Sequence, residues 1–420
     1  MNYNHALEFA IRKANELKKP LVVYFGLMND FPEANERHYY FMLEGLKDVK
    51  DQLNDLGIKM VVFHCSPEDG AINLSDEACL VVTDRGYLKI QKNWRARAAS
   101  NISCPLVQVE TDVVVPVEEV SNKEEFAART IRPKITGKRD EYLIPLNQTK
   151  PKNSSLDLTF NDLDIEDTDQ ALKLLNINRS IKKSSFYRGG PIVAEKILQE
   201  FLTNKLDLFP EHRNHPGEEF LSNMSPYLHF GKISPVYIAL RAKQHGGPGL
   251  AAYLEELIVR RELSMNFMSF NNAYDSFDCL PSWAKGTLAE HGKDKREYIY
   301  TLEELEKSKT HDPYWNTAQT EMVITGKMHG YMRMYWGKKI LEWSEIPQEA
   351  YERVLHLNNK YELDGRDPNG FAGVAWCFGK HDRPWTDRKI FGKVRYMNAK
   401  GLERKFDMKR YLMKIDKISN

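Results

Sequence analysis

The sequence has no long apolar segment, few cysteines and almost no net charge. No run of about 18 apolar residues occurs, so we expect no membrane-spanning helix. The five cysteines, Cys65, Cys79, Cys104, Cys279 and Cys377, are odd in number and scattered, so we expect reduced thiols and no metal site. Lys and Arg number 60 against 59 Asp and Glu, and the net charge of +1 excludes a uniformly basic DNA packager. A local basic patch remains compatible with this balance.

The first third of the chain alternates between apolar runs and helical patterns. Strands are predicted at 21–25, 59–63, 78–83 and 106–109, with helices at 3–17 and 38–56. Such alternation is typical of βαβ units in a parallel sheet. No Gly-x-Gly-x-x-Gly follows any of these strands, which argues against a dinucleotide-binding turn. We therefore predict an α/β domain over residues 1–145.

The character of the chain changes after residue 145. Residues 146–185 are polar, turn-rich and then acidic, as in an interdomain linker. Beyond them strand signals nearly vanish, and helical periods dominate at 191–202, 226–245, 249–270, 317–343 and 348–360. We predict an all-helical second domain over residues 186–420.

The first candidate site precedes a predicted helix. Ser225 has the character of an N-cap and Pro226 of the first helical residue, while Ser222 and Asn223 add short polar side chains. Such a helix start suits a phosphate or pyrophosphate group. A capped helix without any ligand explains the same residues.

Two further candidates lie on predicted helices. Glu256 and Arg260 are spaced i,i+4, which predicts either a solvated ion pair or, if Glu256 is buried, a carboxyl with a raised pKa. His329, Arg333 and Trp336 share one helical face, and Trp343 lies roughly 10.5 Å beyond Trp336 along the axis. An aromatic stripe of this kind is either core packing or a ladder for single electrons, with Trp315 as a third step.

The last two candidates lie toward the carboxyl end. Glycines and Pro368 within 364–376 predict a structured loop whose acidic side chains pair with Arg333. From Lys380 to Asn420 there are 13 Lys or Arg against 5 Asp or Glu, with aromatic residues interleaved. This pattern indicates either phosphate contacts with base stacking or a solvated terminus.

Taken together, five blocks resemble the class II cyclobutane pyrimidine dimer DNA photolyases of the photolyase/cryptochrome family. The blocks are Ser222–Gly231, Glu256–Glu262, Thr310–Asn316, Gly326–Trp336 and Tyr361–Gly370, and the likeness spans about residues 3–410. It implies a Rossmann-like α/β domain, an all-helical FAD-binding domain, and light-driven repair in which reduced FAD gives an electron to the dimer and splits it. Family members usually begin one strand earlier, so we expect the parallel sheet to lack its first strand. Val374, where class I enzymes carry a flavin-proximal tryptophan, favours class II.

The resemblance also implies roles for individual residues. FAD would contact Phe209 (where a tyrosine is expected), Ser222, Asn223, Met224, Ser225, Arg261, Asn266, Trp315, His329, Arg333 and Asp364. Asn358 would approach the flavin N5, and Trp336, Trp315 and Trp343 would form the chain that photoreduces the flavin. Glu256 would hydrogen-bond to the dimer. Arg213, Met334, Trp376, Arg383, Trp385 and Arg395 would contact the lesion or the surrounding DNA.

The expected partner is therefore UV-damaged double-stranded DNA. We expect a monomer without membrane or metal, located in the cytoplasm with the nucleoid. An antenna chromophore, 8-hydroxy-deazaflavin or a folate, is left open. The alternative is a cryptochrome-like photoreceptor that binds flavin without repairing DNA; a (6-4) photolyase is disfavoured because no matching histidine pair is present.

Overall fold

The amino-terminal part of the protein contains two short pairs of parallel strands. In the computed structural model, which describes residues 3–419, β1 (Val22–Gly26) pairs with β2 (Lys59–Phe63), and β3 (Val81–Asp84) pairs with β4 (Leu106–Val109). The predicted strands are thus present within a few residues of their expected bounds. Within the described residues no strand joins the two pairs, so the parallel sheet is interrupted. Met1 and Asn2, which precede the predicted first helix, lie outside the described residues.

Four helices accompany these strands: α1 (His5–Leu17), α2 (Glu36–Asp55), α3 (Pro67–Ser75) and α4 (Lys89–Asn101). The amino end of α2 is fixed by a capping box, in which Asn35 and His38 satisfy each other's backbone. One face of α2 buries apolar side chains such as Leu43 and Leu53 against β2. The body of α2 is therefore anchored in the α/β part, and its capped amino end is ordered where it meets the helical body.

The segment before the predicted linker packs with the helical body, not with the strands. It contains α5 (Val117–Val120) and α6 (Ala128–Tyr142), and α6 packs against the helical turn Glu255–Arg260. Val115, Ile131 and Ile135 are buried in the same apolar cluster as Phe201 and other residues of the helical part. The boundary predicted at residue 145 marks the point where the polar linker begins. The apolar core of the helical body, however, already includes side chains from about residue 113 onward.

The predicted linker, 146–185, is extended but firmly attached to the α/β part. Ser155 Oγ donates to Leu21 O at 2.5 Å and Leu163 N donates to Val62 O at 2.7 Å. Ile165 is fully buried, and a short helix, α7 (Thr168–Lys173), packs against α2. The segment is therefore packed and hydrogen-bonded to the α/β part along its length, unlike a flexible linker.

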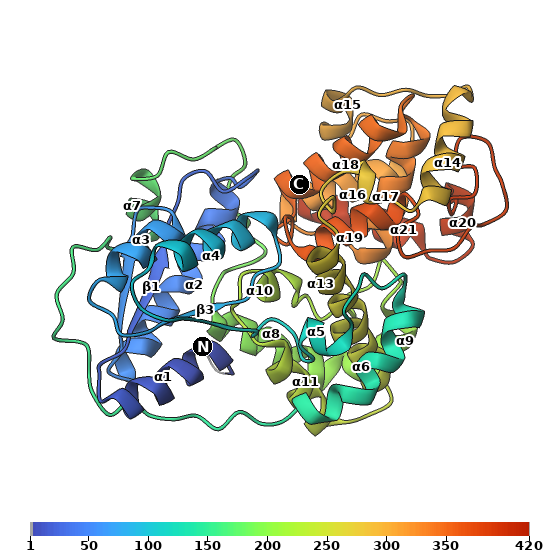
Figure 1. Ribbon diagram of the computed structural model, residues 1–420. Coiled ribbons are helices and arrows are strands. Elements are labelled where there is room, and N and C mark those ends of the chain that lie inside the picture. The colour runs from blue at the N-terminus through green and yellow to red at the C-terminus, as the bar shows by residue number, and fades with distance from the viewer. Residues whose placement is uncertain (1–2, 420) are drawn as a thin grey trace.

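The rest of the chain is helical, as predicted. Its elements are α8 (Pro191–Asn204), η1 (Leu206–Leu208), α9 (Phe209–His212), α10 (Ser225–His229), α11 (Pro235–His245), α12 (Leu250–Leu254), η2 (Glu255–Arg260), α13 (Arg261–Phe270), η3 (Phe277–Cys279), α14 (Ser282–Glu290), η4 (His291–Lys293), α15 (Leu302–Glu306), α16 (Pro313–Thr325), α17 (Gly330–Glu342), α18 (Pro347–Tyr361), α19 (Pro368–Cys377), α20 (Ala399–Glu403) and α21 (Met408–Ser419). In Figure 1, α13 connects the group around α6 and α11 with the group formed by α14 to α21. No helix in residues 3–419 is long and apolar enough to cross a membrane.

Three predicted elements were wrong in extent. The helix expected over 226–245 is broken, because Gly231 has a φ of +63° and Pro235 starts a new helix. The helix expected over 317–343 is divided at Gly326, whose φ of +85° ends α16 in a left-handed cap. The loop expected over 364–376 ends at Asp367, which caps α19 with Pro368 in its first turn.

Candidate functional site

Arg333 is the centre of the candidate site. It lies one turn into α17, and its Nη2 donates to Asp364 Oδ1 and to Glu362 Oε2, both at 2.7 Å. Burial alone would raise the pKa of Asp364, but the neighbouring cations Arg333 and Lys327 keep it well below its usual range. The predicted pairing of Arg333 with an acidic residue of the 364–376 segment is therefore present.

Glu362 is a second carboxylate to which the sequence analysis gave no role. Its side chain is fully buried, and its oxygens accept hydrogen bonds from Met328 N at 3.1 and 3.2 Å as well as from Arg333. Burial raises the pKa of Glu362 to about 8, although Arg333 opposes the shift. Glu362 stands two residues before Asp364, directly after a helix, and nothing in the sequence distinguishes it from an ordinary acidic residue at a helix end.

Three buried polar atoms around Arg333 lack a well-formed hydrogen bond among the described residues. They are Ser225 Oγ, which lies beside the Asp364 carboxylate, His329 Nε2, which lies beside the carbonyl of Arg213, and Arg333 Nε. A buried polar group without a good partner costs about 1–3 kcal/mol, so such atoms are expected to bind water or a ligand. All three belong to the set expected to contact FAD. The residues present therefore fit a large polar cofactor at this place.

The chemistry of His329 can be stated more closely. It caps α17, and its Nδ1 accepts a hydrogen bond from Tyr331 N at 3.2 Å. Burial and the nearby Lys327 lower the pKa of His329 to about 3, so the ring is neutral. Because Nδ1 is the acceptor, Nε2 carries the proton. Nε2–H is therefore a hydrogen-bond donor, and it lies beside the carbonyl of Arg213.

The serine-rich segment differs from the prediction in its capping. Ser225 is the first residue of α10 and not its N-cap; Met224 occupies the cap position, with no side-chain hydrogen bond there. Asn223, which adopts a φ of +55°, and Ser222 precede it. With only five residues, α10 contributes little helix dipole, so an anion here would depend on donors such as the Ser225 hydroxyl, which lies beside Asp364.

Other expected FAD residues are already engaged by protein groups. Arg261 is paired with Asp112 of the loop after β4, through both the side chain and the carbonyl of Asp112. Asn266 accepts from Glu125 N at 2.7 Å and donates to Lys123 O at 3.0 Å. These bonds hold 112–125 against α13. Contact of Arg261 and Asn266 with FAD stays a prediction.

Two further residues of the expected set, Phe209 and Asn358, are buried. Phe209 packs edge-to-face on Tyr253 at 5.5 Å, and the Tyr253 hydroxyl is itself buried, beside Ser222. Sequence reasoning missed Tyr253, since a tyrosine in a helix gives no signal of its environment. Asn358 is also buried, and its amide donates to Asn359 Oδ1 at 3.1 Å.

Trp336, Trp315 and Trp343 form a contiguous chain. The rings of Trp315 and Trp336 are stacked with centroids 6.4 Å apart, and Trp315 meets Trp343 at 5.5 Å. The indole N–H of Trp315 donates to Trp336 O at 3.0 Å, and that of Trp336 to Gln319 Oε1 at 2.8 Å. Trp315, from α16, thus lies between Trp336 of α17 and Trp343, the residue that follows this helix. The chain begins one turn from Arg333.

Glu256 is placed by an irregular helix. Residues Glu255–Arg260 form a π-helical turn, which moves each side chain relative to its α-helical neighbours. Arg260 therefore pairs with Glu255, five residues back, and the predicted i,i+4 contact with Glu256 is wrong. Glu256 instead binds Arg213 Nη1 at 2.6 Å and is 38 % exposed, so it is not the buried carboxyl considered above.

A second group of expected DNA contacts lies beyond α19. Arg395 is sandwiched by two indoles, with its guanidinium 4.4 Å from the ring centre of Trp385 and 5.5 Å from that of Trp376. Arg383 also lies over Trp385, which is 39 % exposed. Met334, on α17, is partly exposed where this helix packs against α19. The structure thus joins aromatic and cationic side chains on a solvent-facing surface.

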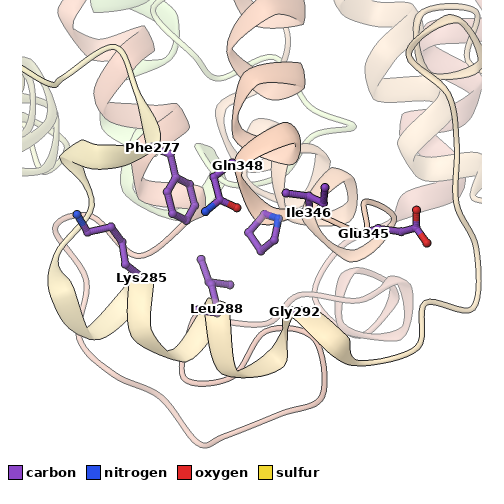
Figure 2. A pocket seen from close by; sticks show the side chains of 9 residues that line it. Phe277, Lys285, Leu288, Gly292, Glu345, Ile346 and Gln348 are labelled. Atoms are coloured by element: carbon purple, nitrogen blue, oxygen red, sulfur yellow. The ribbon is translucent and has the colours of Figure 1, made fainter.

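A pocket of about 260 Å³ lies away from all of these residues. Its lining includes Phe277, Leu288 and Ile346, between α14 and the amino end of α18. Figure 2 shows its side chains grouped around a mixed polar and apolar space. None of the expected site residues lines it, so the pocket is not part of the candidate site.

Comparison with known proteins places the chain in a family. A profile of the DNA photolyase family matches residues 1–152. A deoxyribodipyrimidine photo-lyase from Methanothermobacter thermautotrophicus is 56 % identical over 414 residues, covering 99 % of this chain and 92 % of that protein. The chain belongs to the DNA photolyase family. A further photolyase relative, from Potorous tridactylus, is 39 % identical and is covered to 78 %, against 98 % of this chain.

The fold of this photolyase is also that of a solved relative. The crystal structure of an archaeal photolyase from Sulfolobus tokodaii, described as containing two FAD molecules, matches with a TM-score of 0.74 at 16 % identity. The match covers 98 % of this chain and 86 % of that one. The α/β region followed by a helical body, predicted from the sequence, is therefore confirmed.

Proposed function

We propose that this photolyase is a light-driven DNA-repair enzyme that uses FAD to split cyclobutane pyrimidine dimers. The observation that carries the proposal is the composition of α17. Its cap residue His329 is a neutral, buried imidazole, its Arg333 presents an unpartnered Nε, and one turn later Trp336 begins the stacked indole chain. One helix therefore joins a cofactor-binding surface to a route for single electrons. The extensive identity with deoxyribodipyrimidine photo-lyases supports the same function.

The residues around Arg333 would hold the cofactor. When bound, FAD supplies a light-excitable electron donor in its reduced form. His329 Nε2 and Ser225 Oγ would donate hydrogen bonds, and the Arg333–Asp364 pair would fix the orientation of the flavin ring. Because Asp364 stays ionised, its carboxylate holds the Arg333 guanidinium in a fixed orientation toward the ligand. Asn358 is proposed as the neighbour of the flavin N5.

The indole chain would carry electrons toward this site. Trp343, Trp315 and Trp336 are buried, and each pair of neighbours is in ring contact. An electron can therefore pass between adjacent rings without crossing solvent. The chain would serve reduction of the cofactor before repair, so it is not needed for repair by protein that is already reduced.

The lesion would be held between two groups of residues. Glu256, kept in place by Arg213, would hydrogen-bond to the dimer. Met334, Trp376 and Trp385 would line the pocket for the lesion, and Arg383 and Arg395 would fill the space in the duplex from which the dimer has been extruded. Extrusion costs a few kcal/mol for an ordinary base and less for a damaged one, which favours the lesion over intact DNA.

The test is repair of a duplex oligonucleotide that contains one thymine dimer. Purified, reduced, FAD-loaded protein should restore the thymines under blue light and leave the dimer intact in the dark. Glu256→Ala should lower repair while flavin binding is kept. Flavin-loaded protein that leaves the dimer intact under blue light would contradict the proposal and favour a photoreceptor.

Four finer points extend this proposal. We propose a class II enzyme, because Val374 replaces the class I tryptophan. We also propose action as a monomer and association with the nucleoid, supported by the basic carboxyl-terminal segment. An absorption spectrum of the purified protein will show whether an antenna chromophore, deazaflavin or folate, is bound in addition to FAD.

A further inference from the structure

The segment between β1 and α2 in the α/β part is hydrogen-bonded to the last turn of α18 in the helical body. Asn35 Nδ2 donates to the carbonyl of Lys360 at 2.7 Å, and Arg37 Nη1, at the start of α2, donates to that of Tyr361 at 2.9 Å. Asn35 and Arg37 are 1 % and 5 % exposed. Two buried side chains therefore hold this segment in one register against α18.

This register brings Glu33 beside Asn359, in an unusual conformation. The φ of Glu33 is +57°, in the left-handed region that a glutamate rarely adopts. Its Oε2 accepts a hydrogen bond from Asn359 Nδ2 at 2.5 Å, and its Oε1 lies 3.3 Å from His356 Nδ1. The side chain of Glu33 is 37 % exposed, while Asn359 is 1 % exposed. A solvent-facing carboxylate on a strained residue thus reaches a buried amide, and strained residues of this kind cluster at functional sites.

The hydrogen bonds fix the orientation of two consecutive side-chain amides on α18. A carboxylate only accepts, so Asn359 must turn its NH2 group toward Glu33 and its oxygen away from it. That oxygen accepts from Arg366 N at 3.0 Å and from Asn358 Nδ2 at 3.1 Å. The backbone N–H of Arg366 only donates, so it independently fixes Asn359 in the same orientation. Asn358 must therefore turn its NH2 group toward Asn359, and its Oδ1, to which no group in residues 3–419 donates, is left for a ligand.

We infer that Glu33 is a positioning residue of the flavin site, which acts through Asn359 to turn the oxygen of Asn358 toward the flavin N5. This inference rests on the proposed FAD site and on the proposed place of Asn358 beside N5. An oxygen at this place accepts a hydrogen bond from N5–H, which reduced flavin carries, and it repels the lone pair on N5 of oxidised flavin. The relay from Glu33 therefore favours the reduced form, which repair requires. A residue of the α/β part thus tunes a cofactor bound in the helical body.

The midpoint potential of the bound flavin tests this relay. Reduction by dithionite adds two electrons and one proton to the flavin, and the proton is carried by N5. Glu33→Ala releases Asn359, so the amide of Asn358 can rotate and offer its NH2 group to unprotonated N5. The equilibrium should then shift about tenfold toward oxidised flavin, which lowers the midpoint potential by about 30 mV for a two-electron couple. An unchanged or raised potential would overturn the inference.

Glu33→Gln separates the orientation of the amide from the charge of the carboxylate. Glu33 also faces the buried guanidinium of Arg366, so the loss of its charge acts there as well. Removing a negative charge favours an anionic reduced flavin and raises the potential, whereas loss of the orientation lowers it. Glutamine keeps an oxygen that accepts from Asn359 Nδ2, so this variant should not show the fall. A potential lowered equally by Glu33→Gln and Glu33→Ala would overturn the inference.

Glu306→Ala is the matched control for a general loosening of α18. Glu306 is a partly buried carboxylate that accepts from Lys360 Nζ at 2.6 Å and lies 3.4 Å from the hydroxyl of Tyr361. It therefore binds the same last turn of α18 without a bond to Asn358 or Asn359. Its replacement should leave the midpoint potential unchanged, and a fall equal to that of Glu33→Ala would contradict the relay.

A second measurement needs no cofactor. In flavin-free protein made with isotope-labelled asparagine, the side-chain NH2 signal of Asn359 is identified by its absence from Asn359→Ser. Glu33→Ala should shift this signal and speed the exchange of its protons with solvent, and Glu306→Ala should do neither. A signal that stays unchanged in Glu33→Ala would show that the bond is absent in solution and would overturn the inference. Protein that fails to bind FAD or to repair the dimer would instead refute the proposed function, and this is seen separately.

Discussion

Replacing Trp315 by phenylalanine should interrupt electron flow while leaving the protein folded. Trp315 is fully buried between Trp336 and Trp343, with ring-centre distances of 6.4 and 5.5 Å. The change removes the indole N–H bond to Trp336 O, worth about 1 kcal/mol, and leaves space for which roughly 1–2 kcal/mol is lost. The expected cost of about 2–3 kcal/mol is severe but below the stability of most domains.

The functional effect should be much larger than the structural one. Phenylalanine is far harder to oxidise than tryptophan, so the route from Trp343 to Trp336 is interrupted at its middle position. Photoreduction of oxidised flavin, followed by absorbance in the presence of a thiol, should be strongly slowed. Repair by chemically pre-reduced protein should stay near the wild-type rate, because the chain acts before repair.

Trp283→Phe is the matched control for this experiment. Trp283 is partly buried, and its indole nitrogen has no hydrogen-bond partner among the described residues. It lies outside the chain of ring contacts that joins Trp336, Trp315 and Trp343. Photoreduction in this variant should match wild type. A Trp315→Phe protein that unfolds cooperatively and still photoreduces at the wild-type rate would show that these rings are only packing.

Three other predictions follow from the geometry. Gly365→Ala should destabilise the protein by about 1–3 kcal/mol and weaken FAD binding in a fluorescence titration, because its Cβ would lie 2.7 Å from Asn358 O; unchanged binding and stability would contradict this. Trp385→Ala should weaken binding to dimer-containing DNA by about 1–3 kcal/mol in an anisotropy titration, as for one lost base stack, and equal affinity would remove this role. Burial lowers the pKa of His38 and of His329, to about 3 for the latter, so unfolding takes up protons below pH 6.5. Over this range the buried Glu362 and Glu262, whose pKa values are raised to about 8, act with the opposite sign, so the test is the comparison of wild type with His329→Gln. As the pH drops from 7 to 5.5 in urea unfolding, the wild type should lose up to about 1.4 kcal/mol per pH unit relative to the variant, and parallel profiles would contradict the buried neutral state.

The sequence was sufficient for features that depend on local pattern. Apolar runs located β1 to β4 because buried parallel strands are continuously apolar, and helical periods located α8 and α18 within a few residues. Spacing along one helix also placed Arg333 near Trp336. These features need no knowledge of what lies opposite each side chain.

Features that depend on tertiary contact were missed. No local pattern reveals that residues 255–260 are π-helical, and this turn moves Arg260 from Glu256 to Glu255. Likewise, Glu362 reads as an ordinary acidic residue at the end of a helix until its full burial beside Arg333 is known. Packing also decided that α5 and α6 join the helical body, since their apolar faces match that core and not the strands.

The measurement that tests the central claim most directly is the action spectrum of repair. Reduced, FAD-loaded protein is mixed with a duplex that carries one thymine dimer, and dimer loss is measured at a series of wavelengths. The account predicts repair that follows the absorption of the protein-bound reduced flavin, with none in the dark. Repair that proceeds in the dark, or dimers that persist at every wavelength the bound flavin absorbs, would contradict it.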